Sequence, residues 1–525
     1  MTENTQRLWG RRKPRQTAKP GMPREKLRWD ITNDKRAHDD MPEVLAHPAM
    51  PYRPYSRDHT LCLLVPGSTG EAPRVVPGDA ATLVSYLSQY VDTFGSKTVG
   101  KGDSAKDVQT PKLISEKVCK AAANNIHFPY PPLRNIVTSP VILRDGSLLT
   151  EPGYHAPSGL FLHLGDDLPQ VPDRPTDAEV EEARTFLVHR VLGDFEFVER
   201  SDLANYLGYL FTPLLREYVG GITPVFFIKA DNPGSGKSYL AKFGGVVFGI
   251  ARMPWPKDNE EEVRKQITAV LHSSAEPYIL IDNVPAGTLV KSPQLAELLT
   301  SDTWSDRPLG FSRMVKMDNN RVWVMTGNNI SMGGDVGRRS IPVRLTCSAP
   351  HPEDRDPEQF SVGDLLDWAA EHRGEVLHAM LVLASSWLAG GAKEGKATLA
   401  CFDRWAKVTS GFLNHIGVEG FLEHRTAIVT AQSTDAEAWE ALLIAWYGVH
   451  GNNWLGAAEI ANNATFEDLL AETGCGYLNA RTLGSELRSH AGRWYGSYRI
   501  LRKTDSHSKT ARWCVEKNGG QSPRG

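Results

Sequence analysis

A buried-strand pattern, a glycine-rich loop and a helical stretch follow one another without interruption near the middle of the chain. The strand pattern covers residues 224–230, and the helical stretch covers residues 239–243. Between them lies Asp-Asn-Pro-Gly-Ser-Gly-Lys-Ser, residues 231–238. Small residues let the backbone N–H groups of such a loop curl around a phosphate, and the N-terminus of the following helix adds partial positive charge. The sequence therefore predicts a phosphate-binding loop in an α/β domain with a parallel sheet.

Side-chain chemistry assigns roles within this loop. We expect Lys237 to reach the β- and γ-phosphates of ATP, and the hydroxyl of Ser238 to ligate Mg²⁺. Asp231 stands where the GxxxxGK[ST] pattern has its first glycine, and aspartate tolerates turn geometry better than most residues. The predicted ATP-binding residues are Asn232, Pro233, Gly234, Ser235, Gly236, Lys237 and Ser238.

A second apolar strand, residues 278–281, ends in the pair Asp282–Asn283. A carboxylate at the end of a buried strand beside the phosphates is suited to hold Mg²⁺, so Asp282 is predicted as the second metal ligand. Many ATPases of this kind carry Glu where Asn283 stands. An amide can orient a water molecule but cannot accept a proton at neutral pH, so either another acid acts as the base or hydrolysis is slow.

A third strand pattern, residues 321–326, leads into Gly-Asn-Asn. An amide at the tip of this strand can sense the γ-phosphate, and we expect Asn328 to do so, with Asn329 as the alternative. Arg338 and Arg339 follow shortly afterwards. A guanidinium has a fixed charge and a fork of donors, which suits an arginine finger that reaches the nucleotide of a neighbouring subunit. The alternative role for this pair is surface salt bridging.

Five motifs therefore occur in a fixed order. They are the phosphate loop, Leu-Ile-Asp-Asn at 280–283, Asp-Arg-Pro-Leu-Gly at 306–310, Thr-Gly-Asn-Asn at 326–329, and the arginine pair. Together they resemble the superfamily-3 helicase domains of viral and mobile-element primase-helicases, over residues 140–516 and most strongly over 224–346. The resemblance implies an AAA+-like ATPase that uses ATP and Mg²⁺. It also implies a homo-oligomeric, hexameric or similar ring that threads single-stranded DNA.

The resemblance further implies a hairpin that contacts DNA inside the ring, here residues 309–321. Its expected turn is Asp318–Asn320, and Arg313 and Lys316 are the expected phosphate contacts. If the hairpin has no such role, these two cations belong to a solvated strand face. Relatives often carry a primase ahead of the motor, but residues 46–175 show no convincing acidic pair on a strand. We therefore expect any primase to be a separate partner.

Residues 451–517 have the pattern of a small winged-helix domain. Helical stretches at 456–470 and 479–492 precede two strand patterns, 493–503 and 509–516. In such a domain the second helix enters the major groove of duplex DNA, and the wing contacts phosphates. The basic residues here are Arg481, Arg488, Arg493, Arg499, Arg502, Lys503, Lys509 and Arg512. The predicted DNA contacts are Arg488, Arg493, Arg499 and Arg502, and the alternative role of the domain is protein binding.

The fold class expected from these patterns is a multidomain α/β protein with a P-loop, parallel-sheet core. Residues 1–45 are predicted to be a disordered basic tail, because nine cations between Arg7 and Arg28 are interrupted by proline and glycine. The other expected segments are a mixed N-terminal domain of unknown role (46–175), a helical collar (176–222), the ATPase (223–350), a helical subdomain (351–450), the winged helix (451–517) and a polar tail (518–525).

Composition narrows the cellular setting. The net charge is −3, so basicity is local and the whole chain is no polycation. No uncharged apolar run reaches the roughly 20 residues that span a bilayer, and the N-terminus lacks the apolar core of a secretory signal. The six cysteines are scattered singly, which argues against a zinc ribbon or a disulfide framework. We expect a cytoplasmic protein without a membrane partner.

Three functions fit these observations. The first is an ATP-dependent DNA helicase for replication of a phage, plasmid or integrated mobile element. The second is a non-translocating ATP switch that binds origin DNA and loads or recruits other replication or defence machinery, which Asn283 favours. The third is a P-loop enzyme of another class, such as a small-molecule kinase, which needs neither DNA nor a ring. Strand displacement separates the first two.

Overall fold

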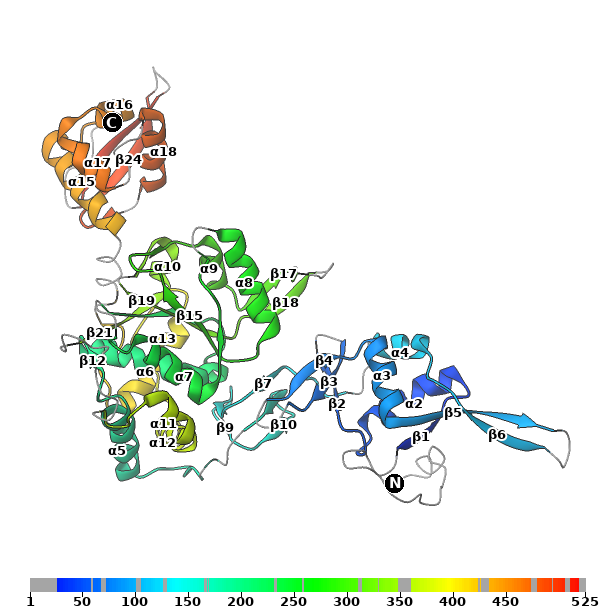
Figure 1. The fold of residues 1–525 in the computed structure, drawn as a ribbon. Coiled ribbons are helices and arrows are strands. Elements are labelled where there is room, and N and C mark those ends of the chain that lie inside the picture. The colour runs from blue at the N-terminus through cyan, green and yellow to red at the C-terminus, as the bar shows by residue number, and fades with distance from the viewer. Residues whose placement is uncertain are drawn as a thin grey trace. The chain divides into compact units, whose positions relative to one another are not determined.

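The computed structural model gives a mixed α/β protein with several sheets (Figure 1). It describes residues 26–57, 60–67, 72–100, 105–125, 130–164, 168, 170–230, 234–256, 259–309, 314–328, 330–347, 360–423, 425, 434–473, 479–492, 494–505 and 510–518. The chain forms two compact units, residues 1–170 and 171–525. Within the described ranges, no helix combines the length and the apolar character needed to cross a membrane.

The first unit combines small sheets with three helices. The helices are α2 (Asp34–Ala46), α3 (Ala80–Tyr90) and α4 (Glu116–Ala123). The strands are β1 (Leu27–Asp30), β2 (Arg53–Arg57), β3 (Thr60–Val65), β4 (Arg74–Pro77), β5 (Val91–Val99), β6 (Lys106–Pro111), β7 (Asn135–Val137), β8 (Val141–Ile142), β9 (Leu148–Leu149), β10 (Gly153–His155) and β11 (Leu160–Leu162). They pair as β1-β5-β6, β2-β3-β4, β10-β11-β7 and β8-β9. β8 and β9 pair antiparallel around the turn that contains Asp145 and Gly146.

The prediction of a disordered tail as far as residue 45 is wrong for residues 26–45. β1 pairs in parallel with β5, and α2 begins at Asn33, whose side chain accepts hydrogen bonds from two backbone amides. Leu27 and Trp29 from one face of β1, and Met41 from α2, are buried in the core of the unit. The cations at the start of this segment obscured its apolar alternation, and the partner strand lies over 60 residues away, at Val91.

The second unit is built on a six-stranded sheet in the order β12-β21-β13-β19-β15-β14. Its strands are β12 (Glu196–Phe197), β13 (Val225–Ala230), β14 (Ile250–Arg252), β15 (Tyr278–Val284), β19 (Val322–Asn328) and β21 (Ser340–Thr346). All of them run parallel except β12, which is antiparallel to β21. The parallel sheet expected for residues 223–350 is therefore present, because long β-branched and aromatic runs such as Val225–Ala230 are buried on both faces.

Helices and short strands surround this sheet. The helices are α5 (Asp177–Thr185), the π-helix η2 (Phe186–Val191), α6 (Arg200–Val219), α7 (Lys237–Phe248), α8 (Glu260–Ser273), α9 (Pro293–Leu298), α10 (Gly334–Arg338), α11 (Leu365–Glu371), α12 (Arg373–Ala389) and α13 (Asp403–His415). The short strands are β16 (Leu289–Val290), β17 (Thr303–Asp306), β18 (Val315–Asp318) and β20 (Ser331–Met332). The residues Phe402, Trp405, Val408, Phe412 and Leu413, at and after the start of α13, are buried.

Residues 196–219 belong to the sheet unit and do not form a separate collar. β12 extends the six-stranded sheet, and α6 packs against β21 and α13. The hydroxyl groups of Tyr206 and Tyr209 donate to the carbonyl oxygens of Leu240 and Ala241 on α7, at 3.0 and 2.8 Å. A capping box formed by Thr176 and Glu179 starts α5.

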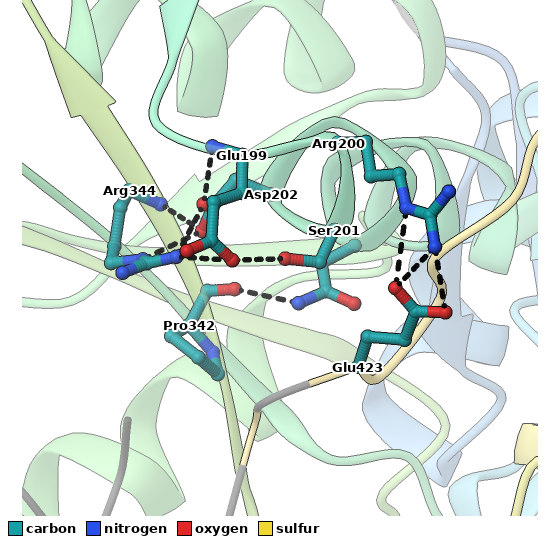
Figure 2. Close-up of polar contacts among 8 residues, drawn as sticks. Glu199, Arg200, Ser201, Asp202, Pro342, Arg344 and Glu423 are labelled. Atoms are coloured by element: carbon teal, nitrogen blue, oxygen red, sulfur yellow. Dashed lines mark hydrogen bonds and ion pairs between the residues drawn. The ribbon is translucent and has the colours of Figure 1, made fainter. Parts of the chain in front are cut away.

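A buried ion pair fastens the N-terminus of α6 to β21 (Figure 2). Asp202 is completely buried, and its carboxylate accepts hydrogen bonds from the Arg344 guanidinium (2.9 Å) and from the Arg344 backbone amide (2.8 Å). The same carboxylate caps α6 by accepting the Glu199 amide at 3.1 Å. Beside it, Arg200 forms an exposed pair with Glu423 at 3.0 Å (Figure 2).

The segment between β15 and β19 contains a hairpin, but its turn is not where the sequence suggested. β17 and β18 pair antiparallel, with Thr303 opposite Asp318 and Asp306 opposite Val315. The turn therefore lies between residues 306 and 315, and the expected turn at Asp318–Asn320 is wrong. Asn319 is instead buried at the base of the hairpin, where its amide donates to the Leu298 and Ser301 carbonyl oxygens.

The C-terminal module includes a helix that precedes its predicted start at residue 451. Its helices are α15 (Thr434–His450), α16 (Ala457–Ala461), the 3-10 helix η5 (Ala464–Phe466), α17 (Glu467–Glu472) and α18 (Ala480–His490). Its sheet contains β22 (Leu455–Gly456), β25 (Ala511–Lys517), β24 (Tyr498–Thr504) and β23 (Trp494–Tyr495), in that spatial order. Trp439 and Trp446 of α15 are buried in the core that also holds Leu487 and Trp513. The 351–450 helical segment therefore loses α15 to this module.

We predict that Asp202→Ala destabilises the contact of α6 with β21 by about 3 kcal/mol, because it removes the helix cap and leaves Arg344 without its buried partner. Native-state hydrogen exchange of α6 and β21 amides measures the free energy of opening. Glu423→Ala is the matched control: it breaks an exposed pair in the same region and should cost less than about 1 kcal/mol. Equal effects of the two substitutions would contradict a stabilising role of burial.

Candidate functional site

The carboxyl ends of β13, β19 and β15 form one edge of the six-stranded sheet. Ala230, the last residue of β13, lies opposite Asn328, the last residue of β19. Gly327 in turn lies opposite Val284 at the end of β15. After β13 the chain crosses to β14, the outermost strand on one side of the sheet. It later returns to the other side of β13 as β21. Ligands of open α/β sheets bind at such a switch in strand order, so this edge is the candidate site.

The glycine-rich loop joins β13 to α7 at this edge. Asp231, Asn232 and Pro233 lie outside the described residues. Gly234 and Gly236 have positive φ angles of 73° and 86°, a conformation that glycine adopts without strain. The Phe195 ring also lies so close that a β-carbon on Gly236 would be 2.6 Å from Cε1.

Lys237 is the first residue of α7, and Gly236 is its N-cap. The Lys237 side chain is buried, and Nζ donates to Ser235 Oγ at 3.0 Å. The unsatisfied amides at the N-terminus of this 12-residue helix favour an anion. Buried ammonium group, helix terminus and left-handed glycines therefore occur together at the end of β13.

Asp282 is the centre of the polar contacts at this edge. Its Oδ1 accepts hydrogen bonds from Ser238 Oγ (2.8 Å) and Thr326 Oγ1 (2.5 Å), and its Oδ2 pairs with Lys242 Nζ at 2.9 Å. Burial acts to raise the pKa of Asp282, but the hydrogen bonds from Thr326, Lys242 and Ser238 outweigh it and hold the pKa below its usual value. Asp282 is therefore a carboxylate at neutral pH.

Ser238 and Asp282 present the ligand types that Mg²⁺ prefers. A hydroxyl oxygen and a carboxylate lie 2.8 Å apart, next to the N-terminus of α7. Hard cations such as Mg²⁺ take oxygen ligands and usually retain waters and phosphate oxygens in their coordination sphere. The donor set therefore fits the metal that the sequence predicted.

Asn283 has a conformation that explains its residue type. Its φ angle is +57°, in the left-handed region, where asparagine is several-fold enriched among non-glycine residues. The pairing of β15 with β19 shifts register between Ile281 and Val284, so Asn283 lies on a bulge. Its amide donates to Thr326 Oγ1 at 2.9 Å, and its side chain is exposed. The backbone thus accommodates asparagine more easily than glutamate here.

Asn328 places an amide group between the ends of β13 and β15. Its Oδ1 is buried and accepts no hydrogen bond from the described part of the chain. A buried acceptor without a partner is costly unless a ligand or water satisfies it. This oxygen cannot accept a hydrogen bond from a phosphate oxygen, but it can accept one from a water molecule, so Asn328 is suited to orient a water at this edge. Its alternative, Asn329, lies outside the described residues.

Arg338 and Arg339 lie at the opposite side of the sheet from the candidate site, where the parallel strands have their amino ends. They precede β21, and the Val225 amide at the start of β13 donates to the Arg339 carbonyl oxygen at 3.0 Å. β13 has six residues, and a parallel strand rises about 3.3 Å per residue, so the two edges are about 17 Å apart. Arg338 is 75% exposed and pairs with Asp335, whereas Arg339 is 16% exposed. Neither guanidinium can reach the site of its own chain.

The predicted DNA contacts have different environments. Arg313 and Arg493 lie outside the described residues. Lys316 on β18, Arg488 on α18 and Arg502 on β24 are exposed. Arg499 pairs with Glu516 across the β24–β25 hairpin, and its guanidinium lies 4.7 Å from the centre of the Trp494 ring. The structure thus leaves Arg499 less suited to a phosphate than the other three.

Sequence reasoning missed two residues of the site, Thr326 and Lys242. Thr326 links Asp282 to the Asn283 amide and so joins β19 to β15. It belonged to the Thr-Gly-Asn-Asn motif, which was the available signal for it. Lys242 on α7 pairs with Asp282 near the end of β15, and no local sequence pattern predicts such a contact.

Comparison with known proteins gives distant structural relatives only. No family model and no curated protein sequence matches the chain. Solved structures that align with it include the NrS-1 C-terminal region (13% identity, TM-score 0.38, covering 90% of this chain and 98% of that one). The SCCmec type IV Cch active helicase (12%, 0.39, 89% and 93%) and the JCV helicase (12%, 0.23, 49% and 65%) also align. At these TM-scores we base the functional proposal on the geometry of this chain alone.

We predict that Gly236→Ala destabilises the protein by about 1 kcal/mol more than Gly287→Ala. Both glycines have left-handed φ angles, 86° and 73°, so each substitution pays a strain of about 1 kcal/mol. Only the β-carbon at residue 236 would also clash, with Phe195, whereas the one at 287 meets open space. Calorimetric unfolding of both variants measures the difference, and equal losses would mean that the Phe195 contact gives way freely.

Proposed function

We propose that the carboxyl edge of the six-stranded sheet binds and hydrolyses ATP. The observation that carries the proposal is the joint placement of three features at the ends of three neighbouring strands. They are Lys237, the Ser238–Asp282 pair, and the buried Asn328 Oδ1, which has no hydrogen-bond partner among the described residues. A surface turn with a chance Gly-Lys-Ser sequence requires no such placement. The loop 231–238 is accordingly a phosphate loop, and Asp282 is the carboxylate of the Mg²⁺ site.

Each residue of the site has a separate task in this reaction. Mg²⁺, held by Ser238 and Asp282, would neutralise the negative charge of the phosphates. Lys237 and the amides at the start of α7 bind those phosphates, and Asn328 accepts a hydrogen bond from the attacking water and orients it. Thr326 fixes the carboxylate of Asp282.

The distance between the two ends of the strands supports the proposal of a ring or similar oligomer. Arg338 is exposed, carries a permanent charge and lies about 17 Å from its own site, so it can contribute only to the nucleotide of a neighbouring copy. A head-to-tail interface of this type closes into a ring when the rotation allows it. We propose a hexameric or similar ring with Arg338 as the finger and Arg339 as its support.

The ring is proposed to move along single-stranded DNA as a helicase. The exposed Lys316 on the β17–β18 hairpin supplies a phosphate contact, and the hairpin is anchored to the ATPase core through Asn319 and Asp306. The described part of the C-terminal module contains helices α15 to α18 and a four-stranded sheet that includes the β24–β25 hairpin, with exposed Arg488 on α18 and Arg502 on β24. This arrangement supports a winged helix that binds duplex DNA through phosphates, with an affinity that falls steeply with salt.

A second candidate is an ATP switch that binds DNA without translocation and recruits a separate primase or other machinery. It is favoured by the absence of an acid at position 283, where an exposed asparagine follows Asp282. ATP turnover with and without single-stranded DNA, together with displacement of a forked duplex, separates the candidates. DNA-stimulated turnover with displacement supports the helicase, and DNA binding without displacement supports the switch.

We predict that Lys237→Ala abolishes ATP hydrolysis, because it removes the buried ammonium group at the start of α7. Steady-state phosphate release measures the effect. Lys265→Ala is the control, since Lys265 is a lysine on α8 that pairs with Glu261 away from the site. Wild-type turnover of Lys237→Ala would exclude this edge as the ATPase site.

We predict that Arg338→Ala lowers kcat by about 10³-fold without weakening ATP binding, because the finger acts on charge that develops during phosphoryl transfer. Fluorescent-nucleotide titration and turnover are measured on the same preparation. Arg184→Ala on α5 is the matched control, because Arg184 also forms an i,i+3 ion pair and lies outside the site. Loss of ATP affinity in Arg338→Ala would rule out a finger in trans.

A further inference from the structure

Arg425 is a buried arginine whose described contacts are all backbone carbonyl oxygens. It is 8% exposed. Its Nε donates to Ser340 O at 2.6 Å, and its Nη2 donates to Gly337 O at 3.0 Å and also to Arg338 O. Burial lowers the pKa of Arg425 to about 10, so the guanidinium remains charged at neutral pH. Arg425 therefore binds the backbone of the segment that carries Arg338 and Arg339.

These carbonyl groups mark the C-terminus of α10 and the start of β21. The last carbonyls of a helix have no partners within it, and a guanidinium satisfies several of them at once with a fixed fork geometry. α10 has only five residues, so it offers little intrinsic rigidity to the arginine pair at its end. Arg425 supplies that rigidity from outside.

The segment that carries Arg425 is itself held on α6. The Leu422 amide donates to Asn205 Oδ1 at 3.0 Å, and the Asn205 amide donates to Pro342 O of β21 at 3.0 Å. Phe421 is buried and lies against Gly208, where a β-carbon would be 2.7 Å from the ring. The Arg200–Glu423 pair adds an exposed contact on the same segment (Figure 2). Arg425 therefore extends from a fixed base.

From this geometry we propose that Arg425 is a positioning residue for the arginine finger: it holds the 337–340 backbone so that Arg338 is presented to the ATP site of the next subunit. The proposal rests on the proposed function, since it requires that Arg338 act in trans. It predicts that loss of Arg425 impairs the neighbour's site and leaves its own subunit's ATP site intact.

The test uses mixed oligomers of the full-length chain. Arg425→Met should bind ATP with wild-type affinity but turn over on the order of 100-fold more slowly, because a displacement of about 1 Å is sufficient for such a loss. Mixed with Lys237→Ala subunits, which have an intact finger and no working site, it should regain activity. Random mixing places an intact finger against an intact site at about a quarter of the interfaces of a head-to-tail ring.

Three control variants distinguish the outcomes. Arg338→Ala mixed with Lys237→Ala should recover ATP hydrolysis in the same way. Arg404→Met, which loses the hydrogen bond from Arg404 to the Tyr218 carbonyl oxygen, should hydrolyse ATP like wild type. Recovery with Arg338→Ala but not with Arg425→Met would overturn the role of Arg425 and leave the proposed function standing. No recovery with either would overturn the trans finger and this inference with it. Arg425→Lys, which keeps the charge but not the fork, replaces Arg425→Met if that variant does not fold, with intermediate turnover expected.

Discussion

The carboxylate of Asp282 joins three elements that the rest of the site depends on. It accepts hydrogen bonds from Ser238 on α7 and Thr326 on β19, and it pairs with Lys242 one turn further along α7. These contacts keep the pKa of Asp282 low and tie the start of α7 to the ends of two strands. Contacts within the chain therefore hold the start of α7 and the ends of β15 and β19 together.

Because the central strands are parallel, the polar residues of the candidate site and the arginine pair lie at opposite ends of the strands. Carboxyl ends hold Lys237, Asp282 and Asn328, whereas the amino end of β21 follows the arginine pair. In the proposed ring, one subunit therefore supplies the ligand site and its neighbour supplies the arginine pair. Arg425 stabilises the backbone at the arginine pair, and Thr326 and Lys242 stabilise Asp282 at the carboxyl ends of the strands.

The corrections to the sequence-based expectations have a common physical cause. Residues 26–45 were assigned to a tail because their cations are local and visible, but β1 is stabilised by pairing with β5. The helical pattern groups α15 with the preceding helices, although Trp439 and Trp446 are buried with residues of β24 and β25, which follow more than 50 residues later. The hairpin turn was placed at Asn319, a residue whose polar groups are satisfied at the base of the hairpin. Each error concerns a contact between residues distant in sequence.

The sequence by itself determined the parallel α/β core, the loop before α7, and the placement of Asp282 and Asn328 at the ends of its strands, because strand patterns and the polar residues that end them are local properties of the chain. Only the tertiary structure decided which strands are neighbours. That order brought Thr326 and Lys242 into contact with Asp282, and it left Arg338 at the amino ends of the strands. It also brought Arg425 into contact with the backbone of residues 337–340. It also gave Asn283 its left-handed backbone, which depends on the bulge between β15 and β19 and so cannot be read from either strand alone.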